Sequence, residues 1–418
     1  MQGSWRIGGC VESFTLSNGI KVLFDKTNGA DIFSLRVLTP SSVISENFDN
    51  AGISNLTSKL AVYCTKSRSN RILNDELGNI GADLSSQTTY DTAGFGISCL
   101  SKYFDKAVEL LADVVINSAF DEKEFSFEKE NSIAALNSRR DNIGALAFDV
   151  FIKLFYGDVP YSFPIIGSKE SILKISREDL LKWHAYSYNA SNILISVCGN
   201  ISSAVVRKSL EKHFSSVEAG KKFEEPVFDI RRDRSVKKEI KSKFKQSYIV
   251  KGFYAPAVLD KDFAAANVIN ALLGGRSSSR LFIELREKLG LAYEVGTVYH
   301  SMKKDSYFAV YIGLDKKNIG LVLEKIDEVL RDFCSTEVSS QELKNVKRYI
   351  KGTYLLDRQT VSRKSYCNAW REIIGQGYKY DLDYLSDIEG VTAHDVLSVA
   401  GNIFSGDAVS VILNPEDK

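Results

Sequence analysis

The sequence predicts an α+β fold built from two homologous domains, each an α/β sandwich with a mainly antiparallel sheet and helices on one face. Two observations lead to this prediction. Segments with strand-like alternation, such as 31–38 and 246–254, come before segments with helical periodicity. The same succession of patterns then occurs twice along the chain. An Asn-Gly turn signal in "SNGIKVLF" marks the first hairpin.

One pair of segments indicates an internal repeat. The apolar residues of "FDKAVELLADVV" (104–115) and "IGLVLEKIDEVL" (319–330) match position by position at a constant offset. Both segments follow the i, i+3, i+4, i+7 spacing of a helix that buries one face. The two segments are predicted to be equivalent helices of the two domains.

A second pair supports the same duplication. The segments 176–200 and 392–416 match at almost the same offset and in the same order as the first pair. Each begins with a Ser or Thr suited to cap a helix, Ser176 or Thr392, and ends in a β-branched strand. Two matches at nearly the same offset indicate a tandem duplication. We therefore expect an N-terminal domain over 1–216, a charge-rich linker over 217–238 and a C-terminal domain over 239–418.

Composition narrows the functional classes. The chain has 418 residues, 44% of them hydrophobic, with 54 basic and 53 acidic side chains. This balance leaves no basic excess for nucleic-acid binding. The segment 1–30 holds no apolar run suited to a signal peptide or membrane span. The six cysteines form no CxxC pair. A soluble chain is expected, and the free thiols favour the cytoplasm.

Five ordered stretches carry a resemblance to a known family. They are "NAGISNL" (50–56), "IGADLSSQTTYDTAGF" (80–95), "LLADVVINSAFDEKEFSFEKE" (110–130), "LFYGDVPYSFPIIGSKESILKISREDLLKWH" (154–184) and "GGRSSSRLFIELREKLGLAYEV" (274–295). Through them the chain resembles, nearly end to end, the pitrilysin and mitochondrial-processing-peptidase family of zinc peptidases with an inverted motif. The resemblance implies the duplicated α/β fold and peptide substrates.

The resemblance also shows where the zinc motif is expected, and the residues at those positions are not zinc ligands. Active members carry H-x-x-E-H on a helix and a distant Glu ligand. The matching positions here are Asn55, Ser58 and Lys59, and the distal ligand falls at or beside Ala135. No His occurs before His184, and no HxxH or HxxxH pair occurs anywhere. We therefore expect this chain to be a non-catalytic member without a metal or cofactor of its own.

A different pair of functional residues is kept. In the family, an Arg and a Tyr seven residues apart bind the substrate and stabilise the transition state, and the resemblance places them at Arg286 and Tyr293. A guanidinium suits a peptide backbone, and a phenol can donate to an oxyanion. Two structural alternatives stay open. In one, Arg286 pairs with Glu284, Glu287 or an acidic residue of a neighbouring chain, and in the other, Tyr293 is a core aromatic residue with a satisfied hydroxyl.

The loss of ligands together with the retention of this pair leads to a functional hypothesis. The chain is expected to be the substrate-binding subunit of a heterodimeric zinc metalloendopeptidase, with zinc held by a homologous partner that bears the intact motif. No activity is expected of the chain alone. Two alternatives are a structural subunit, like the core proteins of the respiratory bc1 complex, and a catalytically inactive peptide-binding homodimer.

Overall fold

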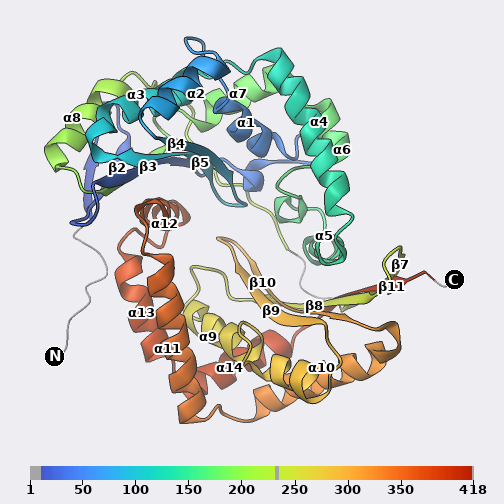
Figure 1. The fold of residues 1–418 in the computed structure, drawn as a ribbon. Coiled ribbons are helices and arrows are strands. Elements are labelled where there is room, and N and C mark those ends of the chain that lie inside the picture. Colours follow the sequence, from blue (N-terminus) through green and yellow to red (C-terminus); the bar gives the residue numbers. More distant parts are fainter. Residues whose placement is uncertain (1–10, 231–234, 417–418) are drawn as a thin grey trace, which may run out of the picture. The chain divides into compact units, whose positions relative to one another are not determined.

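The computed structural model describes residues 11–230 and 235–416, which form two compact units. Unit 1 draws its described residues from Met1–Leu136, Phe163–Val227 and Leu355–Leu382. Unit 2 draws them from Asn137–Ser162, Phe228–Tyr354 and Asp383–Lys418. Each unit contains a sheet with helices on it (Figure 1).

Unit 1 is built on a six-stranded sheet of order β1-β2-β6-β3-β5-β4. All neighbouring strands are antiparallel except β2 and β6. The strands are β1 (Glu12–Thr15), β2 (Lys21–Lys26), β3 (Ile32–Thr39), β4 (Asp83–Thr88), β5 (Ala93–Leu100) and β6 (Leu194–Gly199).

The helices of unit 1 include short 3₁₀ turns and one helix, α4, whose last residues are counted with unit 2. They are η1 (Val43–Ser45), α1 (Ile53–Ala61), α2 (Asn70–Asn79), η2 (Ser101–Tyr103), α3 (Phe104–Asn117), α4 (Glu122–Arg139), α6 (Lys169–Lys174), α7 (Arg177–Ser187), α8 (Ser203–Phe214) and α12 (Val361–Ile374).

The two faces of this sheet are covered differently. Alternate strand residues such as Phe24, Val37 and Phe95 point into the main core beneath α1, α3 and α8. The other face carries a smaller cluster, in which Leu23 and Leu38 pack against Ala369 of α12. Figure 1 shows α3 and α8 over one face and α12 against the other.

Unit 2 is built on a five-stranded sheet of order β7-β11-β8-β10-β9, in which β7 and β11 are parallel and the other pairs antiparallel. The strands are β7 (Val236–Ser242), β8 (Ser247–Ala255), β9 (Glu294–Ser301), β10 (Ser306–Leu314) and β11 (Val409–Pro415). The helical segments are α5 (Ile143–Tyr156), η3 (Pro160–Ser162), α9 (Phe263–Leu273), the π-helical η4 (Phe282–Lys288), η5 (Lys316–Asn318), α10 (Ile319–Ser335), α11 (Ser340–Asp357), α13 (Tyr380–Gly390) and α14 (Ala393–Phe404).

The predicted fold class and duplication are confirmed by the topology. The strand order β2-β6-β3-β5-β4 in unit 1 has the same pattern as β7-β11-β8-β10-β9 in unit 2, with the parallel pair in the same place. Helices α3 and α10 each follow a 3₁₀ turn after the equivalent strand. Ser176 and Thr392 are the N-caps of α7 and α14, each in a capping box with the Asp three residues later.

Each unit also contains a helix from the other half of the sequence. Helix α5, from the N-terminal half, packs on β8 and β11 of unit 2, and α12, from the C-terminal half, packs on β3 and β6 of unit 1. Gly252 of β8 makes room for α5, since a Cβ there would lie 2.2 Å from the ring of Phe151. A helix therefore lies on the second face of each sheet, in addition to those expected on the first.

The domain boundaries proposed at residues 216 and 239 divide the chain into two consecutive duplicated halves. They remain a prediction. The expected linker, 217–238, includes residues 231–234, which lie outside the described residues. Residues 217–230 form no helix or strand, and β7 begins at Val236. Over the described ranges, no helix is long and apolar enough to cross a membrane.

Candidate functional site

The helix that the resemblance assigns to the zinc motif is α1, and its first turn is fixed by buried contacts. Gly52, the N-cap, has φ +94°, and a Cβ there would lie 2.6 Å from the Ile166 carbonyl oxygen. The Glu46 carboxylate accepts hydrogen bonds from the backbone N–H of Gly52 (2.7 Å) and of Ser54 (3.0 Å). Glu46 therefore satisfies two donors that a helix start would leave free.

The position expected for the general base is part of the core. Ser58 is 1% exposed, and its hydroxyl shares a hydrogen bond of 3.1 Å with the hydroxyl of Tyr188. The ring of Tyr188 in turn stacks on Phe95 of the sheet. A buried hydroxyl with a fixed partner stabilises packing between α1 and the sheet and is not available to activate a water molecule.

The position expected for the second histidine holds an ion pair. The Lys59 ammonium lies 2.8 Å from the Glu128 Oε1 atom of α4. Glu128 is only 5% exposed at its side chain, whereas Lys59 is 40% exposed. The pair joins α1 to α4, the helix that also carries Ala135, the expected distal ligand position. A fixed positive charge thus lies where the motif would place a cation.

The side chains at these four positions do not fit a zinc site. An amide, an ammonium and a methyl group stand where the motif has two zinc-binding imidazoles and a zinc-binding carboxylate, and a hydroxyl stands where it has the general base. Within the described ranges, no group of three or more His, Cys, Asp or Glu could hold a metal ion.

His184, on α7, is half-buried near this region. Its ring packs edge-on against Phe120, with centroids 5.3 Å apart, and against Tyr188. Burial lowers the pKa of His184 to about 4, so the imidazole is neutral at physiological pH. The residue belongs to the core between α7 and α1.

An edge strand lies beside α1. Helix α1 packs against β4 and β5, and β4 is the last strand of the unit 1 sheet. The sequence of β4, "DLSSQT", is polar, and most of its residues are half-buried. One backbone edge of β4 is unpaired in the described sheet, which is the arrangement that binds an extended peptide by strand addition.

Arg286 and Tyr293 lie in unit 2, on η4 and just before β9. Arg286 is exposed, and its guanidinium lies over the ring of Phe282, 5.1 Å from the centroid. Tyr293 is 58% exposed, and its hydroxyl donates to Asp315 Oδ1 at 2.9 Å. This hydrogen bond raises the pKa of Tyr293, so the phenol keeps its proton at neutral pH.

Within this chain, the geometry disagrees with both structural alternatives for this pair. Arg286 makes no ion pair with the described acidic residues, and Glu284 pairs with Lys288 at 2.8 Å. Tyr293 is not a core residue, because more than half of its side chain is in contact with solvent. Both side chains are therefore available to a ligand.

Three residues of this region were not singled out from the sequence: Glu46, Glu128 and Tyr188. Glu128 and Tyr188 lie 69 and 130 residues from their partners on α1, so no local pattern identifies them. Glu46 lies six residues before Gly52, outside the positions where capping residues are normally found, so local sequence rules do not identify it either.

Comparison with known proteins identifies the family. A model described as "Insulinase (Peptidase family M16)" matches residues 21–167, and one described as "Peptidase M16 inactive domain" matches residues 174–350. Together they span most of the chain. The chain belongs to peptidase family M16. The predicted resemblance is thereby confirmed, and the inactive-domain match includes Arg286 and Tyr293.

Relatives and solved structures of this M16 chain match over nearly its full length. An "uncharacterized zinc protease" of Rickettsia felis is 28% identical, covering 97% of this chain and 98% of the relative. The "uncharacterized zinc protease YmxG" of Bacillus subtilis is 26% identical, covering 97% and 98%. Among structures, a protease from Helicobacter pylori (TM-score 0.90, covering 98% and 100%) and a peptidase M16 inactive domain from Pseudomonas fluorescens (TM-score 0.91, covering 98% and 99%) are each 21% identical and share the fold.

Proposed function

We propose that this M16 chain is the non-catalytic, substrate-binding subunit of a heterodimeric zinc metallopeptidase. Its partner would be a homologous chain that carries an intact H-x-x-E-H and the zinc ion. This chain would contribute Arg286 and Tyr293 to the partner's active site for hydrolysis of peptides. The observation that carries the proposal is a contrast. In α1, the Ser58 and Lys59 side chains have structural partners within unit 1, whereas Arg286 is exposed and makes no ion pair with the described acidic residues.

The side-chain contacts of α1 support the proposal that this chain is not itself catalytic. Ser58 and Lys59 are held by Tyr188 and Glu128, so both side chains have structural partners within unit 1. Restoring a zinc site would require both contacts to be broken and new ligands to be introduced. The loss of the motif has therefore been accommodated by the core.

The exposure of Arg286 and Tyr293 supports the proposal that they bind a ligand. A guanidinium without an ion pair can bind the carbonyl oxygens of a peptide backbone. A protonated phenol can donate to the oxyanion of a tetrahedral intermediate. Because the Tyr293 hydroxyl donates to Asp315 in the free chain, substrate binding would have to redirect this hydrogen bond.

The test uses the complex as it occurs in the native source. A tagged copy of the chain is purified, and its partner is identified by mass spectrometry and by elemental analysis for zinc. Hydrolysis of internally quenched peptides is then measured for Arg286→Ala and Tyr293→Phe. The matched controls are Arg331→Ala and Tyr349→Phe, which alter exposed residues elsewhere in unit 2.

The expected result is a fall in turnover of about 10²- to 10³-fold for Tyr293→Phe, as for loss of one oxyanion donor. For Arg286→Ala we expect a raised KM together with a lower kcat. Size-exclusion chromatography should show intact complexes, and both controls should be fully active. Full activity of both test variants, in an assembled complex, would favour the structural-subunit alternative. A homodimer without a zinc-bearing partner would favour the peptide-binding alternative.

A further inference from the structure

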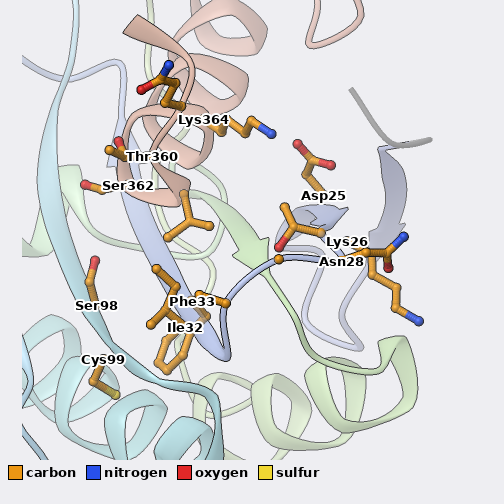
Figure 2. A pocket seen from close by; sticks show the side chains of 15 residues that line it. Asp25, Lys26, Asn28, Ile32, Phe33, Ser98, Cys99, Thr360, Ser362 and Lys364 are labelled. Atoms are coloured by element: carbon orange, nitrogen blue, oxygen red, sulfur yellow. The ribbon is translucent and has the colours of Figure 1, made fainter. Parts of the chain in front are cut away.

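Unit 1 contains a pocket that is separate from the α1 region. Its volume is about 820 Å³, and it lies at the ends of β2 and β5, the start of β3 and the first turn of α12 (Figure 2). The lining includes Asp25, Lys26, Ile32, Phe33, Val361 and Lys364. Asp25 points to the face of the sheet that α12 covers, whereas α1 packs on the opposite face. The pocket is thus not part of the site described above.

Asp25 is a buried acid with an unused acceptor. It is only 4% exposed, and its Oδ2 atom is 3.9 Å from the Cys198 Sγ atom, a weak donor. Its Oδ1 atom has no hydrogen-bond partner among the described residues. Burial raises the pKa of Asp25, and the nearby charge of Lys364 and the amide of Asn368 oppose this effect. Buried carboxylate oxygens are normally hydrogen-bonded, and the nearby Asn368 Nδ2 is likewise without a partner in hydrogen-bond geometry within the described ranges, so Oδ1 is free to accept from a donor in the pocket.

The opposite wall of the pocket is positive. Lys364 faces Asp25 from α12, and Figure 2 shows its side chain directed toward the carboxylate. Helix α12 has 14 residues, and its N-cap Thr360 satisfies the Arg363 N–H, which leaves the preceding N–H groups of the first turn at the pocket. A helix start of this kind favours a negative charge.

These charges exclude the simplest ligands. A plain cation would meet Asp25 but would be repelled by Lys364 and the start of α12. A plain anion would suit that wall but would lie against the Asp25 carboxylate. Between the two walls, Ile32 and Val361 offer apolar surface. The lining therefore matches a ligand with both charges and an apolar body.

We propose that this pocket binds a small zwitterion of the α-amino acid type, either a free apolar amino acid or a short apolar peptide. Its ammonium group donates to Asp25 Oδ1. Its carboxylate accepts from Lys364 and from the first turn of α12, and its side chain packs on Ile32 and Val361. The proposal concerns the isolated chain and does not depend on a peptidase partner.

The test measures binding to the purified chain by isothermal titration calorimetry, with four probes of similar shape. These are L-leucine, the dipeptide Leu-Leu, isopentylamine and 4-methylpentanoate. The expected result is saturable binding of at least one zwitterion, with both singly charged probes about tenfold or more weaker. L-leucine binding more tightly than Leu-Leu identifies a free amino acid as the ligand, and the reverse order identifies a peptide.

Variants locate the binding in the pocket. Asp25→Asn and Lys364→Met should each weaken zwitterion binding about tenfold or more, because each removes one charge-assisted hydrogen bond. The controls Glu130→Gln and Lys169→Met change exposed residues of unit 1 and should bind normally. Lys364→Met keeps the test valid if Asp25→Asn alters folding, which thermal unfolding would reveal. Failure of both zwitterions to bind, unchanged binding in Lys364→Met, or equal binding of isopentylamine would overturn the proposal.

Discussion

Glu46 is predicted to make the stability of unit 1 depend on pH. It is fully buried, and burial raises its pKa from 4.5 to about 7, although the N–H groups of Gly52 and Ser54 partly oppose this shift. Below pH 4.5 the carboxyl group is protonated in both the folded and the unfolded chain. Between pH 4.5 and about 7 the folded chain keeps the proton that the unfolded chain has lost.

The sign and size follow from this difference. Because the folded state binds more protons in that window, the free energy of unfolding falls as the pH rises. The shift from 4.5 to about 7 corresponds to about 3 kcal/mol. The contribution is fully present below pH 4.5 and is lost above about pH 7. Glu46→Gln removes the titration and replaces one of the two acceptors at the start of α1 by an amide N–H₂ group.

Urea unfolding of wild type and Glu46→Gln between pH 4.5 and 8 measures the effect. Tryptophan fluorescence is a suitable probe, since Trp183 and Trp370 lie in unit 1. Glu46→Gln should be the less stable protein at pH 4.5, and its disadvantage should shrink by about 3 kcal/mol toward pH 8. The exposed Glu130→Gln serves as the control and should follow the wild type. Parallel curves for wild type and Glu46→Gln would refute the assignment.

Three further predictions concern metal content, the contact between α1 and α4, and the packing of α5 on β8. The purified chain should contain no stoichiometric zinc and cleave no peptide, because Asn55, Ser58, Lys59 and Ala135 supply no ligand set; elemental analysis that finds one tightly held zinc ion per chain contradicts this. Lys59→Met should destabilise unit 1 by about 1–2 kcal/mol in urea unfolding, less than for a fully buried pair because Lys59 is 40% exposed, and adding Glu128→Gln should restore part of the loss. Gly252→Ala should destabilise unit 2 by about 1–3 kcal/mol, because its Cβ would overlap the Phe151 ring. The control Gly313→Ala should be less destabilising, because the nearest atom to its Cβ, in Tyr248, is 3.6 Å away. Equal thermal unfolding of the two variants would mean that α5 does not pack closely on β8.

Local sequence patterns determined the elements and the duplication. The apolar spacing of 104–115 and 319–330 predicted α3 and α10, and the capping residues Ser176 and Thr392 begin α7 and α14 as expected. These features depend on residues within one or two turns of each other, so they can be read directly from the chain. The family was likewise recognisable from five ordered stretches, and the M16 matches confirm it.

The sequence also indicated which chemistry is missing at α1, but not what replaces it. Where the resemblance places the zinc motif, the sequence has an amide, a hydroxyl and an ammonium, at Asn55, Ser58 and Lys59. The partners that hold two of these positions, Tyr188 for Ser58 and Glu128 for Lys59, come from distant segments. Likewise, Glu284 pairs with Lys288 and not with Arg286. The spacing of these charged residues in the sequence does not tell which pair forms.

Only the tertiary structure decided which sheet each helix covers. The apolar surfaces of α5 and α12 predict burial, but an apolar face carries no label for its partner. Packing places α5 on β8 and β11 and α12 on β3 and β6, so each helix belongs to the unit built mainly from the other half of the chain. The Asp25 pocket arises in the same way. Asp25 and Lys364 come from opposite halves of the sequence, and the packing of α12 on the first sheet brings an acid and an ammonium to one cavity.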